Sequence, residues 1–145
     1  ENKTEGEVML RLGQVYAAKE GKNPAEMSED ALTDVGRHVI DLWNEKAIVP
    51  DGWKVSPEDC IHAWMKFGEK VFKNFHGENI MVVSSNGVIR FAPYLTGDFN
   101  GFAGEHDIKV TTGGVCVFER EDDEENWHCT EWNVKPKKYF ESLPD

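Results

Sequence analysis

Residues 84–87 bring together the kinds of groups that can hold an anion. They are Ser84, Ser85, Asn86 and Gly87. They follow an uninterrupted apolar run at residues 80–83, which predicts a strand buried on both faces, as in a parallel sheet. Asn-Gly is turn chemistry, and helix-like spacing of apolar residues begins directly after it. Because a strand that turns straight into a helix presents free backbone N–H groups, we place the candidate ligand-binding site here.

Three interpretations of Ser85 remain open. As a nucleophile it would need a base, and its surroundings lack the Gly-x-Ser-x-Gly turn that exposes a catalytic serine. As a binding residue it would line a pocket with Ser84 and Asn86 through hydroxyl, amide and backbone N–H groups. In the third interpretation these residues only end a strand and cap the following helix. Arg90 either reaches an anion or lies at the surface, since the helix turn sets its direction.

The spacing of potential metal ligands does not fit a metal site. Cys60 and His62 are two positions apart on one predicted helix and diverge, and His128 and Cys129 alternate faces of a predicted strand. The calcium-loop fragment at residues 98–101 has no glutamate at the required distance. We therefore predict no metal site and no cofactor.

Local patterns predict the elements that must position the site. Ser28 is expected to cap a second helix, and Ser56 followed by Pro57 is the strongest helix start in the chain. The apolar spacing predicts helices over about residues 5–20, 29–46, 57–75 and 88–95, a flexible loop over 96–104, strands over 108–112, 115–120 and 127–132, and a tail over 135–145.

Three segments, in order and with fitting spacing, carry a family resemblance. Residues 83–90, Val-Ser-Ser-Asn-Gly-Val-Ile-Arg, resemble the second signature of the histidine phosphatase (phosphoglycerate mutase-like) superfamily, usually valine-serine-histidine-glycine-glycine-valine-isoleucine-arginine. Residues 1–8 are similar to the family's tryptophan-glutamate-glycine-lysine-threonine segment, and residues 107–118 with 128–133 resemble its closing strands. The resemblance covers nearly the whole chain.

The resemblance implies an α/β fold, a three-layer αβα sandwich of the phosphoglycerate mutase-like type that is incomplete at the N-terminus. Residues 1–145 would form a single α/β domain, the C-terminal part of a larger one. The family's first signature, arginine-histidine-glycine, is absent, because the only Arg-His pair, Arg37-His38, is followed by Val39 in a helical pattern. The general-acid glutamate is also missing, and the second catalytic histidine aligns with Ser85.

The function implied is that of a protein acting on or binding a phosphorylated small molecule. A phosphomonoester hydrolase or mutase activity would belong to the parent protein, and this chain alone is expected to be inactive. The alternative is a catalytically silent relative that serves as a phosphate-ligand or protein-binding module. The small-molecule partner expected at Ser85 is a phosphorylated small molecule or inorganic phosphate, whereas the protein-binding alternative needs no such ligand.

Charge and composition limit the other partners. The net charge of −11, from 16 basic and 27 acidic residues, argues against nucleic acid and offers no basic patch for anionic lipid. No stretch has transmembrane length, and three scattered cysteines fit a reduced, cytoplasmic protein. A strand at residues 80–83 (Ile80, Met81, Val82 and Val83) would lack its family neighbour, so a second chain or a dimer partner is expected to complete the sheet beside it.

Overall fold

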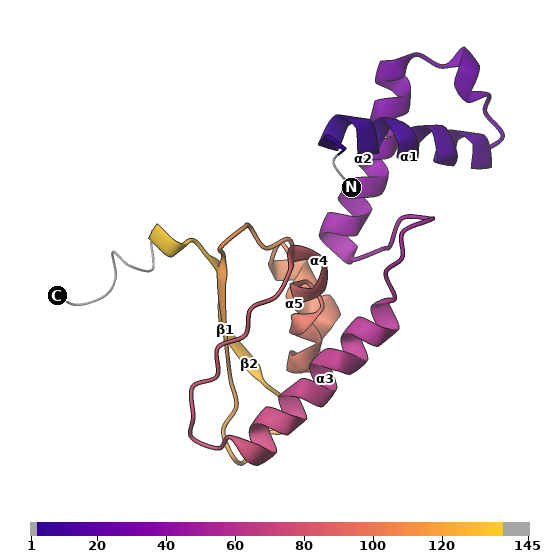
Figure 1. The fold of residues 1–145 in the computed structure, drawn as a ribbon. Coiled ribbons are helices and arrows are strands. Elements are labelled where there is room, and N and C mark those ends of the chain that lie inside the picture. Colours follow the sequence, from indigo (N-terminus) through magenta and orange to yellow (C-terminus); the bar gives the residue numbers. More distant parts are fainter. Residues whose placement is uncertain (1–2, 138–145) are drawn as a thin grey trace. The chain divides into compact units, whose positions relative to one another are not determined.

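The computed structural model describes residues 3–137 and combines helices with a small sheet, which places the chain in the α/β class in general. Its backbone contacts gather in two compact units, Glu1–Val55 and Ser56–Asp145 (Figure 1). The two units are described separately below. The single domain expected over residues 1–145 stays a prediction. Among the described residues, no helix is both long and apolar enough to cross a bilayer.

The first unit contains α1 (Glu5–Lys19), a 3₁₀ turn (Pro24–Glu26) and α2 (Glu29–Lys46). Thr4 and Glu7 form a capping box at the start of α1. Ser28 caps α2 as predicted, because its hydroxyl accepts a hydrogen bond from the Ala31 N–H at 3.2 Å. Both helices therefore begin where local side-chain chemistry satisfies the first unpaired backbone N–H groups.

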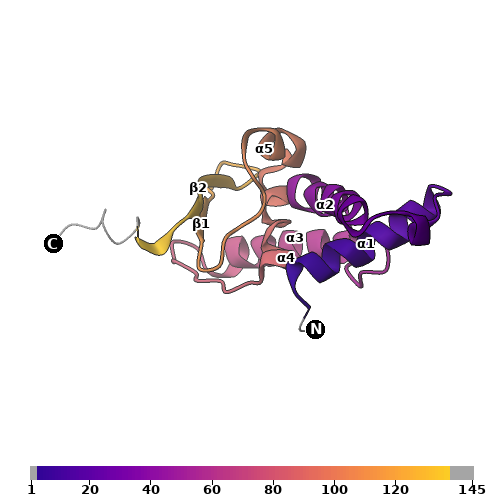
Figure 2. The same cartoon turned by 90° about the horizontal axis from the view of Figure 1, so that it is seen from above.

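Helices α1 and α2 pack with their backbones in direct contact (Figure 2). A Cβ at Gly13 would overlap the carbonyl oxygen of Leu32, and one at Gly36 would overlap that of Met9. Each helix therefore supplies a glycine at the point where the other comes nearest. Apolar side chains of the two helices are buried in this unit, among them Leu12, Ala17, Leu32, Val39 and Trp43.

The second unit begins with α3 (Pro57–Asn74), which starts as the sequence predicts. The Ser56 hydroxyl accepts from the Asp59 N–H at 3.2 Å, and Pro57 occupies the first turn. The helix predicted over 88–95 is present as α4 (Asn86–Ile89) and a 3₁₀ helix (Ala92–Thr96).

The prediction of a flexible loop over residues 96–104 is wrong, because most of this segment forms α5 (Phe99–Glu105). The Asp98 carboxylate caps this helix by accepting from the Gly101 N–H at 2.9 Å. Phe99 stacks on Tyr94 with ring centroids 4.2 Å apart, and Phe102 meets Trp132 edge-on at 5.1 Å. Aromatic packing thus holds a segment that the glycines alone would leave mobile.

The sheet is one antiparallel hairpin of β1 (Val115–Glu119) and β2 (His128–Val134). Its register is irregular, because Val117 lies opposite Glu131 while Phe118 lies opposite Cys129. The predicted hairpin is confirmed, with the acidic residues 121–125 at its turn.

The strand predicted over 108–112 is not part of the ladder. Its place beside β2 is instead held by side chains of β2. Asn133 Oδ1 accepts from the Thr111 N–H at 2.9 Å, and Asn133 Nδ2 donates to the Lys109 carbonyl at 3.3 Å. The Trp132 indole donates to the Asp107 carbonyl at 2.7 Å. Asn133 itself has a φ of +54°, so its own backbone cannot continue a regular ladder there. Ile108 and Val110 are nevertheless buried.

The prediction of a doubly buried strand at residues 80–83 is wrong. The segment crosses the second unit as an irregular chain, and the side chains of Met81 and Val83 are 88% and 84% exposed. The two strands of the described sheet pair with each other, so neither supplies a ladder for this segment. An apolar run is buried on both faces only when neighbouring strands and two covering layers exist, and within residues 3–137 the sheet has two strands.

Candidate functional site

The candidate binding residues lie where the irregular chain enters α4. Ser85 occupies the N-cap position, but its side chain makes no capping hydrogen bond. The turn is closed by the Ser85 carbonyl, which accepts from the N–H groups of Val88 at 3.0 Å and Ile89 at 2.9 Å. Ser84, Ser85 and Asn86 are all exposed. The capping interpretation therefore holds for the position of Ser85 and not for its hydroxyl.

Arg90 is buried directly behind this turn, with 2% of its surface exposed. Its Nη2 donates to Asn86 Oδ1 at 2.8 Å, and its Nε donates to the Asn86 carbonyl at 3.2 Å. Burial lowers the pKa of Arg90 to about 10, while the charge of Asp107 acts in the opposite direction. The guanidinium is still cationic at neutral pH, so a positive charge lies one hydrogen bond from Asn86. A surface position for Arg90 is excluded.

A hydrogen bond to α3 fixes α4 in place. The indole Nε1–H of Trp64 donates to the Val88 carbonyl at 2.9 Å. Trp64 also meets Phe67 edge-on, with ring centroids 6.1 Å apart. Aromatic residues of α3 therefore hold α4, and with it the turn at residues 84–87, in place.

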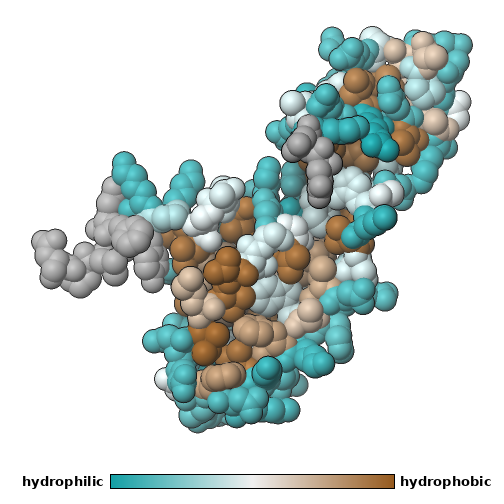
Figure 3. Space-filling model, viewed as in Figure 1, coloured by the Kyte–Doolittle hydropathy of each residue, from teal (hydrophilic) through white to brown (hydrophobic). Residues whose placement is uncertain are grey.

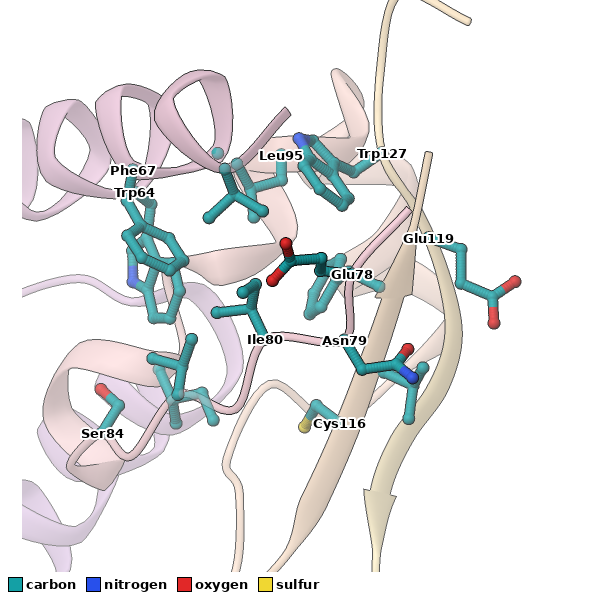
Figure 4. Close-up of a pocket in the computed structure, with 16 residues that line it drawn as sticks. Trp64, Phe67, Glu78, Asn79, Ile80, Ser84, Leu95, Cys116, Glu119 and Trp127 are labelled. Atoms are coloured by element: carbon teal, nitrogen blue, oxygen red, sulfur yellow. The ribbon is translucent and has the colours of Figure 1, made fainter. Parts of the chain in front are cut away.

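A cavity of about 310 Å³ lies between α3, the hairpin and the chain at residues 78–84 (Figure 4). Its walls are mainly apolar and aromatic and include Trp64, Phe67, Leu95, Phe118 and Trp127. In Figure 4 the carboxylate of Glu78 points into this space, whereas that of Glu119 points away from it. Such a cavity suits apolar side chains more than a highly charged ligand.

Of the four predicted binding residues, Ser84 lines this cavity, while Ser85, Asn86 and Gly87 do not. The predicted site is therefore an exposed turn at the margin of the cavity. Sequence reasoning missed the cavity itself, since its aromatic walls come from α3, from β1 and from the residue before β2. The sequence carries no signal for it, because residues 80–83 are apolar throughout and only the structure shows that Ile80 and Val82 line the cavity while Met81 is exposed.

The remaining chemistry-bearing residues form no second centre in residues 3–137. No group of three or more His, Cys, Asp or Glu side chains there could hold a metal ion. Cys60, Cys116 and Cys129 are free thiols. Burial and the neighbouring thiol of Cys116 raise the pKa of Cys129 to about 12, so it is not a ready nucleophile.

Comparison with protein-family models, with curated protein sequences and with solved structures finds no match for this chain.

Proposed function

We propose that this chain is the C-terminal part of a histidine phosphatase-like protein and binds a phosphorylated small molecule at residues 84–87. The three-layer αβα sandwich belongs, in this proposal, to the longer protein. Its place of action is the cytoplasm, where free thiols such as those of this chain persist. The chain by itself does not catalyse phosphoryl transfer.

The buried cation at Arg90 is the observation that carries the proposal. Arg90 is 2% exposed, and its guanidinium donates hydrogen bonds to both the side chain and the backbone of Asn86. A fixed positive charge at low dielectric attracts an anion more strongly than a solvated lysine would. The overall charge of −11 opposes this attraction, so we expect weak affinity for inorganic phosphate.

The turn also supplies neutral hydrogen-bond donors. Because Asn86 Oδ1 is held by Arg90, its Nδ2 is the group left to donate to a ligand. The Gly87 N–H belongs to the first turn of α4, where backbone donors have no acceptor within the helix. The exposed hydroxyls of Ser84 and Ser85 complete a set of donors that suits the oxygens of a phosphate monoester.

The lack of an activated nucleophile supports the proposed inactivity. In the part of the chain that the structure describes, no hydrogen bond joins the Ser85 hydroxyl to a histidine or any other base. A serine without a positioned base is a weak nucleophile. Ser85 therefore keeps the position of the family's second histidine as a binding residue in this proposal.

The second candidate is a catalytically silent relative that binds a protein. The exposed apolar chain at residues 80–83 favours it, because Met81 and Val83 are more than four-fifths exposed.

Two measurements on the 145-residue chain test phosphate binding. Phosphorus NMR of inorganic phosphate should show line broadening on addition of the wild-type chain and much less with Asn86→Ala. An aryl phosphate should not be hydrolysed above background. Saturable hydrolysis of the aryl phosphate that is lost in Ser85→Ala would establish a serine nucleophile. Phosphate lines that stay sharp with the wild-type chain would contradict phosphate binding at residues 84–87.

A further inference from the structure

The backbone at residues 80–83 has unused hydrogen-bonding capacity. Within the described residues, none of its N–H or C=O groups takes part in a hydrogen bond. The preceding chain is tied down at Glu78, whose N–H donates to the Phe75 carbonyl at 3.1 Å, and the following chain at Ser85. Residues 80–83 lie between these two anchors, so the segment is held at both ends and its backbone groups remain open along its length.

The side chains of this segment alternate between two environments. Ile80 and Val82 are 40% and 46% exposed and line the cavity, whereas Met81 and Val83 are 88% and 84% exposed. This two-residue period is the pattern of an extended strand. Figure 3 shows apolar residues gathered on the face of the second unit where the segment runs. The segment thus has the side-chain pattern of a strand and lacks the ladder.

The charges around residues 80–83 indicate which charge a binding partner of this segment should carry. The lining residues include Glu78, whose carboxylate points into the cavity, and Glu119, whose carboxylate points away, and among the described residues no lysine, arginine or histidine lines it. The acidic turn of the hairpin approaches the end of α3, where His76 Nδ1 lies 3.2 Å from Asp122 Oδ1. The end of the segment at Glu78 is therefore acidic, whereas the end at Ser84 leads into the turn that lies in front of the Arg90 guanidinium.

A second copy of the chain is a poor fit to these charges. Each copy carries a net charge of −11, so two copies repel. The matching segment of a second copy, residues 78–85, contains no basic side chain to meet Glu78.

We propose that residues 80–83 bind an extended segment of a partner protein by strand addition. The partner's backbone pairs with residues 80–83, its alternate apolar side chains enter the 310 Å³ cavity, and a basic residue lies beside Glu78. The inference deepens the protein-binding candidate and is independent of phosphate binding at residues 84–87.

A peptide of two lysines followed by alternating valine and threonine is the probe. On titration into the 145-residue chain, the amide signals of residues 80–83 should shift and their hydrogen exchange should slow. Phosphate binding is read at different amides, so the two proposals fail separately. A peptide of the same composition with the valines grouped together should bind at least several-fold more weakly, because its side chains no longer alternate.

Backbone pairing and the charge contact each have a matched control. Two peptides are N-methylated at alternate residues, one on each edge of the peptide strand. Their affinities should differ strongly, because only one edge of the peptide forms the ladder with residues 80–83. Glu78→Gln should weaken binding of the lysine peptide about two- to fivefold, the range expected for one exposed ion pair. Binding of a peptide without lysine should be unaffected.

Three results would overturn the proposal. The first is that the amide signals of residues 80–83 do not change at millimolar peptide concentration. The second is that both N-methylated peptides bind with equal affinity. The third is dimerisation of the chain alone by light scattering with residues 80–83 protected from exchange, which would make the occupant a second copy.

Discussion

Arg90 and Asn86 are joined by two hydrogen bonds, from Nη2 to the side-chain oxygen at 2.8 Å and from Nε to the carbonyl oxygen at 3.2 Å. The contact spans one turn of helix and binds a buried cation to the residue that begins α4. It orients the Asn86 amide and keeps a positive charge behind the exposed turn at residues 84–87. Both the shape and the electrostatics of the candidate site depend on this pair.

Asn86→Ala should lower the free energy of unfolding by about 1.5 kcal/mol, because a buried guanidinium loses one charge-assisted hydrogen bond. Urea unfolding followed by circular dichroism measures this difference. Asn79→Ala is the control, since Asn79 is exposed and lies at the cavity without a hydrogen bond in the described structure. Equal stability of the two variants would show that the contact to Asn86 Oδ1 contributes nothing.

The two serines at helix starts should differ in their effect on stability. Ser56→Ala removes the hydroxyl that accepts from the Asp59 N–H and should cost about 1 kcal/mol. Ser85→Ala occupies an equivalent position but removes no capping bond, so its cost should stay below about 0.5 kcal/mol. A larger loss for Ser85→Ala than for Ser56→Ala would contradict the assigned capping chemistry.

Gly13→Ala should destabilise the first unit by about 3 kcal/mol, because the added Cβ overlaps the carbonyl oxygen of Leu32 in α2. Gly6→Ala on the same helix has no atom within 4 Å of the new Cβ. It should stabilise α1 by about 0.5–1 kcal/mol through helix propensity. Thermal melts of the two variants should therefore move in opposite directions, and a neutral Gly13→Ala would rule out backbone contact between α1 and α2.

The ion pair of Glu69 and Arg120 should make stability depend on pH. The hydrogen bond from Arg120, at 2.8 Å, holds the pKa of Glu69 below its ordinary value of 4.5. A carboxylate with a lowered folded-state pKa stabilises the fold above the unfolded pKa, and this contribution is lost as the pH falls through the folded-state value.

Glu69→Gln should therefore cost at most about 0.5 kcal/mol at neutral pH, since Glu69 is half exposed and solvent screens the pair. The difference from the wild type should vanish well below pH 4.5. Urea unfolding of both proteins across this range is the measurement, and a gap that stays constant with falling pH would contradict the assignment.

Elements with local signals were predictable from the sequence. Ser28 and Ser56 mark the starts of α2 and α3 because a cap and an amphipathic stripe are encoded within a few residues. The hairpin of β1 and β2 follows from two strand-like runs around an acidic turn. These elements need no information from distant parts of the chain.

Elements that depend on neighbours were not predictable. The apolar run at 80–83 specifies a strand but not whether another strand lies beside it, and none does among residues 3–137. Asn133 replaces a ladder with its side-chain amide, which no periodicity signals.

The candidate site shows the same limit. Residues 84–87 were identified from the sequence as a candidate site, but the burial of Arg90 behind them was not predicted. The cavity wall combines Trp64 with Trp127, which are distant in sequence, so only the folded chain reveals it.

An amide NMR titration of the 145-residue chain with inorganic phosphate tests the proposed binding site most directly. Saturable shifts at Ser84, Ser85, Asn86, Gly87 and Val88, reduced in Asn86→Ala, are the predicted result. Unchanged signals at these five amides, or shifts confined to other parts of the chain, would contradict the proposal that this turn binds a phosphorylated ligand.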